Sequence, residues 1–296
     1  MFHIILAFKR YRALFVCLLI LVLLTSSQSA ALAKGRALQF DALQKRLIND
    51  GFDANQIKKL YSKPKIHFET RGVSLFFMHQ ESKLNYDQFL SENCIQSAKK
   101  YMEDQKVFLA NAKREFGVDP TIIIAIILVE TRFGTYLGRR SILNTLSTMA
   151  SLSDTEVRDM FWDEIRSSSP LTTEKFNKKA NKKSKWAYNE LKAFLEYTNK
   201  EGLDPVDIKG SYAGAMGIAQ FMPSNILAFA KDGNKDGSIN LHHHGDAIVS
   251  IANFLNHYGW YSAIGKNRAY KVLLNYNYSK PYANTLLKIS KRLKGS

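Results

Sequence analysis

The chain has 296 residues, of which 46% are hydrophobic and 23% charged, and a formal net charge of +16 at neutral pH. This length suits one large domain or two small ones. The charge indicates an anionic partner or surface. Nucleic acid is the usual partner of such a chain, but an export signal at the N-terminus argues against it and favours cell-wall polymer or membrane lipid.

The first 33 residues have the tripartite pattern of a secretory signal peptide. Three cations precede an apolar stretch over 13–24, and small residues offer a cleavage site before Lys34. The apolar stretch is short of the roughly 20 residues that span a bilayer, although an uncleaved anchor remains an alternative. Cys17 has no small residue before it, which disfavours a lipoprotein. We therefore expect a periplasmic protein, free or membrane-associated through an uncleaved signal.

Cleavage would leave Cys94 as the sole cysteine. The exported chain can therefore form no intramolecular disulfide. The apolar neighbours Ile95 and Ala98 predict a buried structural thiol in preference to a nucleophile.

The N-terminal half of the mature chain has mainly helical spacing. Apolar residues over 38–63 recur at helical intervals, and Gly51 divides them into two short helices. Residues 64–86 alternate, which predicts a short hairpin or an extended loop. Residues 87–116 predict one further helix.

Downstream, the pattern predicts helices over 141–151, 186–200 and 245–258. The lysine-rich stretch 167–185 differs in composition, and we expect a solvated loop or frayed helix. A role for this stretch in gripping anionic wall polymer is the alternative. Strand signals are few, so the chain should be mostly helical and without internal repeats.

The segment 122–134 is an almost unbroken apolar run that a single carboxylate, Glu130, closes. Asp119 and Pro120 mark the start of this helix as N-cap and first helical residue. A carboxylate that leaves water tends to have a raised pKa, as a general acid working near neutral pH requires. The alternative is an exposed glutamate at the end of a core helix.

The glycine-rich segment 210–223 is a second candidate. Its glycines allow close backbone approach to a ligand or a neighbouring helix. Ser211 and Gln220 add neutral hydrogen-bonding groups, which suit an uncharged ligand such as a sugar. A tightly packed turn and helix is the competing interpretation.

The segment 232–240 resembles the first half of an EF-hand calcium loop, with oxygen-bearing side chains at alternate positions and Gly237 at the sharp turn. His243 stands where the closing glutamate should be, and Asp246 could supply that carboxylate. A metal-free turn rich in Asp and Asn is the alternative. Zinc at His242–His244 is disfavoured, because three consecutive imidazoles cannot easily face one ion.

These motifs occur together in the order and spacing of the membrane-bound lytic murein transglycosylase B family. The matching segments are Val129-Glu-Thr-Arg-Phe-Gly134, 210–223, the calcium-like loop, and Tyr276-Asn277 with Tyr282-Ala283. The resemblance covers roughly residues 38 to 290.

The resemblance implies a mainly α, lysozyme-like (goose-type) catalytic domain with additional N-terminal helical elements and a small β component. We expect a signal peptide over 1–33, N-terminal helical elements over 34–116, the catalytic domain over 117–275 and a C-terminal helix over 276–296 that closes the cleft.

The resemblance also assigns roles to individual residues. Glu130 matches the catalytic acid and base. Four residues match positions that bind the sugar, namely Ser211, Gln220, Tyr276 and Tyr282. Five match a structural calcium site, namely Asp232, Asn234, Asp236, Ser238 and Asp246. The family's two arginines for the stem peptide do not carry over, because the corresponding region holds only Arg158.

The implied reaction is non-hydrolytic cleavage of the β-1,4 bond between N-acetylmuramic acid and N-acetylglucosamine in peptidoglycan, with a 1,6-anhydromuramoyl product. Hydrolytic muramidases use two carboxylates, and no cleft motif offers a second one. A hydrolytic muramidase and a non-catalytic peptidoglycan-binding protein are the alternatives. We expect a monomer that binds glycan strands and no nucleic acid, with peripheral membrane association as a further option.

Overall fold

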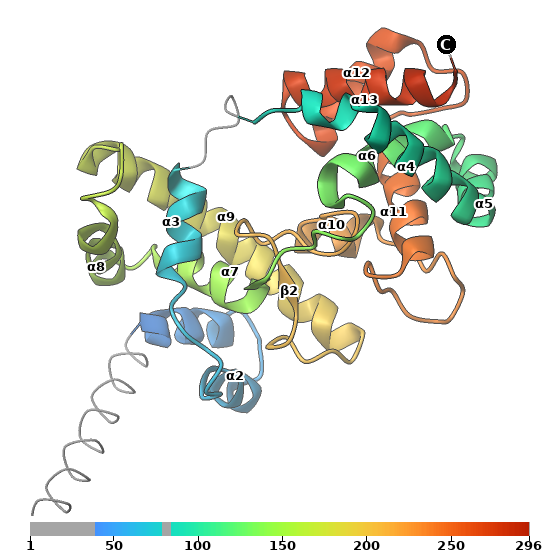
Figure 1. Ribbon diagram of the computed structural model, residues 1–296. Coiled ribbons are helices and arrows are strands. Elements are labelled where there is room, and N and C mark those ends of the chain that lie inside the picture. Colours follow the sequence, from blue (N-terminus) through green and yellow to red (C-terminus); the bar gives the residue numbers. More distant parts are fainter. Residues whose placement is uncertain (1–38, 79–83, 296) are drawn as a thin grey trace, which may run out of the picture. The chain divides into compact units, whose positions relative to one another are not determined.

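The computed structural model describes residues 39–78 and 84–295 (Figure 1). The expected signal peptide lies outside the described residues. The chain divides into two compact units, one ending at Phe68 and the other beginning at Glu69. The helices over 87–116, expected among the N-terminal elements that pack on the catalytic core, belong to the larger unit and pack on its helix α6 (Pro120–Thr131).

The smaller unit has the two short helices that the spacing predicts. They span residues 39–49 and Ala54–Tyr61 (α2). Gly51 separates them with a φ of 99°, a left-handed conformation that glycine adopts without a steric penalty. Phe40 packs its ring near Tyr61 and Phe68, at centroid distances of 5.4 and 5.9 Å.

The larger unit is almost entirely helical, as expected. Its helices are α3 (Thr70–Met78), the short 3-10 helix η2 (Asp87–Leu90), α4 (Glu92–Asp104), α5 (Lys106–Phe116), α6 (Pro120–Thr131), α7 (Ile142–Ser151), α8 (Thr155–Ile165), α9 (Thr173–Lys200), α10 (Pro223–Phe229), α11 (His244–His257), α12 (Lys266–Tyr276) and α13 (Lys280–Leu293).

The apolar helix α6 lies in the core of this unit. Its residues 121–128 are all buried, which explains why the helix has no polar face. It packs against α4, α5, α11 and α13. The Asp119 carboxylate accepts a hydrogen bond from the Thr121 N–H, and Arg132 ends the helix in a left-handed conformation. The predicted start of the helix is therefore confirmed.

The small β component is one antiparallel pair, β1 (Arg140–Ser141) with β2 (Lys209–Gly210). Arg140 lies opposite Gly210 in this ladder. The pair connects the segment after α6 to the start of the glycine-rich segment, although about 70 residues separate the two in sequence.

The hairpin or loop expected over 64–86 is wrong for its central part, which forms α3. Val73 and Phe77 are buried four residues apart, whereas Leu75 between them is 45% exposed. Apolar residues four positions apart fit both an alternating strand and one face of a helix. The segment forms a helix because this arrangement buries Val73 and Phe77 together.

Three further expectations need correction. The helix expected over 87–116 is divided into η2, α4 and α5, with breaks at Ser91 and Gln105. The lysine-rich stretch is not a loop: most of it lies in α9, where Phe176 and Ala180 are buried and most of the lysines are exposed. Cys94 is half-buried, and its thiol lies 3.5 Å from the Gln88 carbonyl oxygen.

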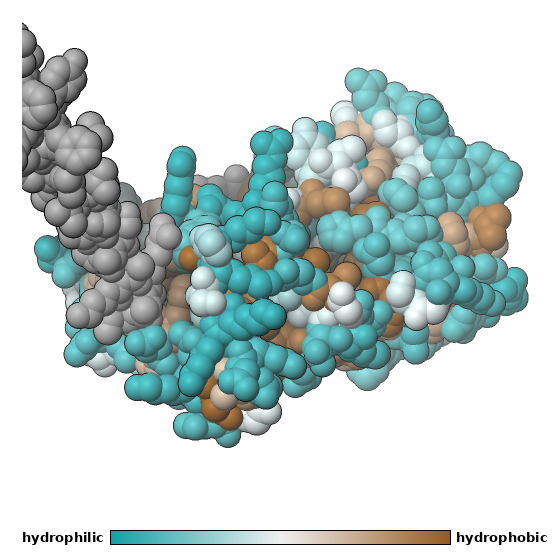
Figure 2. All heavy atoms as spheres, turned by 90° about the horizontal axis from the view of Figure 1, so that it is seen from below, coloured by the Kyte–Doolittle hydropathy of each residue, from teal (hydrophilic) through white to brown (hydrophobic). Residues whose placement is uncertain are grey.

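No helix within the described ranges combines the length and the hydropathy needed to cross a bilayer. The face shown in Figure 2 is mostly hydrophilic, with apolar side chains in small groups between polar ones.

Candidate active site

A cavity of about 520 Å³ surrounds the C-terminal end of α6. It brings together Glu130 and all four residues expected to bind sugar. The described residues that line it are Phe76, Leu84, Asn85, Tyr86, Gln88, Phe89, Val129, Glu130, Ser211, Tyr212, Ala213, Ala215, Gln220, Tyr276, Asn277 and Tyr282. Segments far apart in the sequence therefore meet at one carboxylate.

Glu130 is half-buried in the last turn of α6. Tyr282 on α13 donates a hydrogen bond from its hydroxyl to Glu130 Oε1, at 2.5 Å. Tyr282 is only 1% exposed. Burial, followed by the negative charge of Glu130, raises the pKa of Tyr282 well above its usual value. The Tyr282 hydroxyl therefore stays protonated and acts as a hydrogen-bond donor to the carboxylate.

Tyr276 approaches the cleft from the end of α12. Its hydroxyl donates to the Ala219 carbonyl oxygen at 2.5 Å. Burial and the charge of Glu130 also raise the pKa of Tyr276 well above its usual value. Tyr276 thus links α12 to the glycine-rich segment and lines the cavity.

Ser211 and Gln220 lie at opposite ends of the glycine-rich turn. The Ser211 hydroxyl oxygen accepts the Ala215 N–H at 3.1 Å. The Gln220 side-chain amide donates to the Gly217 carbonyl at 2.8 Å. Both polar side chains therefore stabilise the turn and line the cavity, and their binding of sugar stays a prediction.

The end of α6 is attached to the same turn. The buried Thr131 hydroxyl donates to the Ile218 carbonyl at 3.2 Å and accepts the Gly134 N–H at 3.0 Å. Phe133 and Gln220 have φ values of 62° and 48°. Left-handed backbone at non-glycine residues is costly and is enriched at functional sites.

Sequence reasoning missed the wall of the cleft over 84–89. Tyr86 packs edge-on against Tyr282, with ring centroids 6.0 Å apart. Asn85 and Gln88 add amide groups to the same wall. No motif spacing connects these residues with Glu130. Only the tertiary structure shows that the segment before α4 lies beside the carboxylate.

Among the described residues that line the cavity, Glu130 is the one acidic side chain. Residues 79–83, which include Glu81, are outside the described part of the chain. The described cleft therefore offers a single carboxylate, which a tyrosine orients, within a wall of aromatic and neutral polar groups.

Comparisons with known proteins identify the family of the chain. Residues 36–266 match the family described as "Transglycosylase SLT domain". The chain belongs to this family. It is also 34% identical over 172 residues to the membrane-bound lytic murein transglycosylase B of Escherichia coli. That alignment covers 58% of this chain and only 40% of the relative.

Solved structures of lytic transglycosylases share the fold. SltB1 from Pseudomonas aeruginosa has a TM-score of 0.70 at 22% identity, over 88% of this chain and all of that one. The calcium complex of Escherichia coli Slt35 has a TM-score of 0.67 at 22% identity, over 86% and 92% of the two chains. SltB3 from Pseudomonas aeruginosa with NAG-anhNAM-pentapeptide has a TM-score of 0.68 at 17% identity, over 86% and 78%.

The calcium-like loop of this family member is closed by its own hydrogen bonds. Asp232 accepts the Asp236 and Gly237 N–H groups, and Asp236 accepts the Ser238 N–H and hydroxyl. Gly237 has the left-handed φ of 90° expected at the sharp turn. These residues, together with Asn234, offer only oxygen donors from their carboxylate, amide carbonyl and hydroxyl groups, which suits a hard cation.

Asp246 anchors this loop to α11. The side chain is fully buried and accepts the N–H groups of Gly233, Asn234 and Asn240. In the described part of the chain, no three acidic, histidine or cysteine side chains are grouped closely enough to hold a metal ion. The loop therefore has oxygen ligands of the kind that calcium prefers. The buried Asp246 carboxylate accepts hydrogen bonds from three backbone N–H groups.

The one arginine of the stretch 151–158 already has hydrogen-bond partners. Arg158 on α8 donates to the Asn181 side chain at 2.9 Å and to the Thr155 hydroxyl at 3.3 Å. It lies outside the set of residues that line the cleft.

Proposed function

We propose that this chain is a lytic transglycosylase that cleaves the β-1,4 bond between N-acetylmuramic acid and N-acetylglucosamine in peptidoglycan. The observation that carries the proposal is the pairing of Glu130 with the Tyr282 hydroxyl inside a cleft whose other described walls hold no acid. Ordinary glycoside hydrolases use two carboxylates about 5 to 9.5 Å apart, whereas one carboxylate suffices for an intramolecular transfer.

In the first step, protonated Glu130 donates its proton to the glycosidic oxygen as the bond from that oxygen to the muramoyl anomeric carbon breaks. In the second step, the Glu130 carboxylate takes the proton of the muramoyl 6-hydroxyl. Oxygen 6 then bonds to the anomeric carbon and forms the 1,6-anhydro ring. Water is not consumed, and Glu130 ends in the protonation state in which it began.

Neighbouring groups have positioning roles in this scheme. The Tyr282 hydroxyl fixes the carboxylate orientation, because rotation of Glu130 would break a short hydrogen bond. Ser211, Gln220 and Tyr276 bind sugar hydroxyl and acetamido groups across the cleft. The complex of SltB3 with NAG-anhNAM-pentapeptide supports a glycan strand as the ligand and an anhydro sugar as the product.

Mass spectrometry of a peptidoglycan digest tests this proposal. Purified protein should release anhydromuropeptides, which lack the mass of one water relative to hydrolytic products. Reducing muramic ends would contradict it and identify a hydrolytic muramidase. Sedimentation with cell-wall sacculi without any product would instead identify a non-catalytic binding protein.

We also propose that the calcium-like loop binds one structural Ca²⁺ through Asp232, Asn234, Asp236, Ser238 and Asp246. The complex of Slt35 with calcium supports this assignment. We propose that the protein works in the periplasm, because its proposed substrate lies there and residues 1–33 have the pattern of an export signal. We expect it to act as a monomer, and the net charge of +16 favours contact with anionic envelope surfaces.

A further inference from the structure

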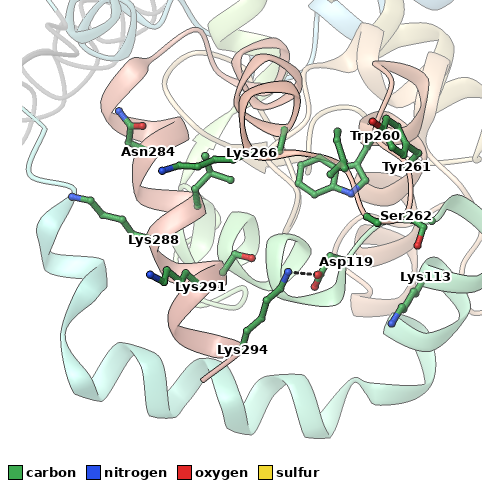
Figure 3. A pocket seen from close by; sticks show the side chains of 16 residues that line it. Lys113, Asp119, Trp260, Tyr261, Ser262, Lys266, Asn284, Lys288, Lys291 and Lys294 are labelled. Carbon is green, nitrogen blue, oxygen red and sulfur yellow. Dashed lines mark ion pairs between the residues drawn. The ribbon is translucent and has the colours of Figure 1, made fainter. Parts of the chain in front are cut away.

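A second, larger cavity lies at the opposite end of α6 from the cleft. It has a volume of about 770 Å³ and is enclosed by the ends of α5 and α6, the 260–264 loop, α12 and α13 (Figure 3). Asp119 lies at this end of α6 and Glu130 at the other, so about 16 Å of helix separates the two sites. The cavity is therefore distinct from the proposed catalytic cleft.

Lysine side chains dominate the polar lining of this cavity, which we call the lysine pocket. Five lysines line it against the single carboxylate of Asp119, namely Lys113, Lys266, Lys288, Lys291 and Lys294. Lys294 forms an ion pair with Asp119 at 2.5 Å. Within the described residues, the other four lysines form no ion pair, so the pocket has an excess of four positive charges.

This excess of charge opposes folding, because like charges around one concavity repel each other. In Figure 3, Lys266, Lys288 and Lys291 extend toward one side of α13, whereas Lys294 points to Asp119. An anion placed between the three extended lysines would relieve the repulsion.

The lining also restricts the kind of anion. None of the described residues that line the pocket is an arginine, and arginine is the residue whose planar fork matches a carboxylate in two hydrogen bonds. Lysine is a compact point charge that several anion oxygens can share, as in phosphate sites. The inner wall includes Trp260, which is only 5% exposed, together with Ile264 and Leu287. The pocket thus combines an apolar wall with a cationic rim.

We propose that the lysine pocket binds a phosphate group, carried either by the headgroup of an anionic phospholipid or by a soluble phosphate compound. The binding leaves the catalytic cleft accessible at the other end of α6. The proposal does not depend on the transglycosylase activity, because it rests on another set of residues.

The test compares three forms of the full chain. The pocket variant carries Lys266→Gln, Lys288→Gln and Lys291→Gln. The control variant carries Lys178→Gln, Lys182→Gln and Lys185→Gln, which remove the same charge from exposed positions on α9. Any contribution of residues 1–38 is the same in all three forms. All six positions are exposed, so all three forms should stay folded, and circular dichroism checks this.

Two probes distinguish the sources of phosphate. The first is co-sedimentation with phosphatidylcholine vesicles that contain or lack about one quarter phosphatidylglycerol. The second is titration with inorganic phosphate, followed by tryptophan fluorescence, since Trp260 lines the pocket. Each lysine close to an anionic surface contributes roughly fivefold in affinity, so the pocket variant should bind about a hundredfold more weakly than the parent.

A loss confined to the pocket variant supports the proposal. If the pocket variant loses affinity for anionic vesicles alone, the ligand is a lipid headgroup. If it loses affinity for inorganic phosphate alone, the ligand is a soluble phosphate. The proposal is overturned if neither probe binds the parent chain. It is also overturned if the control variant loses as much affinity as the pocket variant, because binding would then reflect general surface charge.

Discussion

The Tyr282 hydroxyl lies 2.5 Å from Glu130 Oε1, although 152 residues separate the two in sequence. This contact joins the end of α6 to α13, the last helix of the chain. It explains why the matched Tyr-Ala pattern stands near the C-terminus: the tyrosine is part of the environment of the carboxylate. The proposed mechanism therefore depends on packing between these two helices as well as on the glutamate itself.

Glu130→Gln should fold normally and lose almost all turnover. Glutamine has nearly the same shape and can still accept the Tyr282 hydrogen bond, but it cannot exchange a proton. General acid–base catalysis typically contributes 10² to 10⁴-fold, so we expect a loss of about a thousandfold in product release from sacculi. Circular dichroism checks the fold. Activity near the parent level would show that another group is the acid.

Tyr282→Phe should lower the rate of cleavage by about tenfold to a hundredfold, because it removes one hydrogen bond to a charged group. The buried ring would stay in place. Tyr278→Phe is the matched control, since Tyr278 lies in the same segment and is 91% exposed. Steady-state digestion of soluble glycan strands measures both variants. Equal rates for the two would exclude a positioning role for the Tyr282 hydroxyl.

When the chain has first been treated with a chelator, addition of calcium should raise its melting temperature. A ligand that binds only the folded state stabilises it by about 2.7 kcal/mol at a hundredfold excess over its Kd. Asp236→Asn should abolish this increase, because it removes one charged ligand from an exposed loop position. Scanning calorimetry with and without calcium measures the effect. A parent chain that is indifferent to calcium would rule out the metal site and leave a hydrogen-bonded turn.

The Asp119–Lys294 ion pair should make stability depend on pH in the acid range. Burial opposes ionisation of Asp119, but hydrogen bonds from Lys294 and Thr121 outweigh it and hold the pKa of the carboxyl below its usual value. The unfolded chain thus binds the proton more readily than the folded chain. The stabilisation is complete above about pH 4 and is lost as the pH falls through the folded pKa.

Asp119→Asn tests this pair without removing the helix cap, because asparagine is also a good N-cap. The ion pair is partly exposed, so we expect a loss of about 1 kcal/mol at neutral pH. The difference between parent and variant should disappear once the pH falls below the folded pKa of Asp119, which lies below the usual value of an aspartate. Urea unfolding at several pH values measures it. A difference that persists in acid would indicate lost packing, not lost charge.

Gly210→Ala should destabilise the fold and distort the cleft. A Cβ at this position would lie 2.1 Å from the Ala215 carbonyl oxygen and 2.5 Å from Ile142 Cδ1. Overpacking of this kind typically costs about 1 to 3 kcal/mol. Gly202→Ala is an informative contrast: it has open space around it, and only its φ of 65° is unfavourable. A fully stable Gly210→Ala chain would mean that the turn can move away.

Local signals were sufficient for several parts of this protein. The Asp119 cap, Pro120 and the apolar run predict α6, and Glu130 indeed lies at its end in the cavity. The same approach failed at α3 and in the lysine-rich part of α9. In both segments only a few residues are buried, and they form a narrow face of the helix. The sequence alone does not distinguish such a helix from an alternating strand or a solvated loop, and only its contacts with other helices do.

The sequence by itself determined the family, the mostly helical class, the candidate carboxylate and the oxygen-rich loop, because short motifs with strict spacing carry that information. The tertiary structure decided which groups surround Glu130. It added the wall with Tyr86, it turned the Tyr282 hydroxyl toward the carboxylate, and it gathered lysines from the helices α5, α12 and α13 into one pocket. These relationships join segments that lie tens to more than a hundred residues apart, and helix packing, which no local pattern encodes, brings them together.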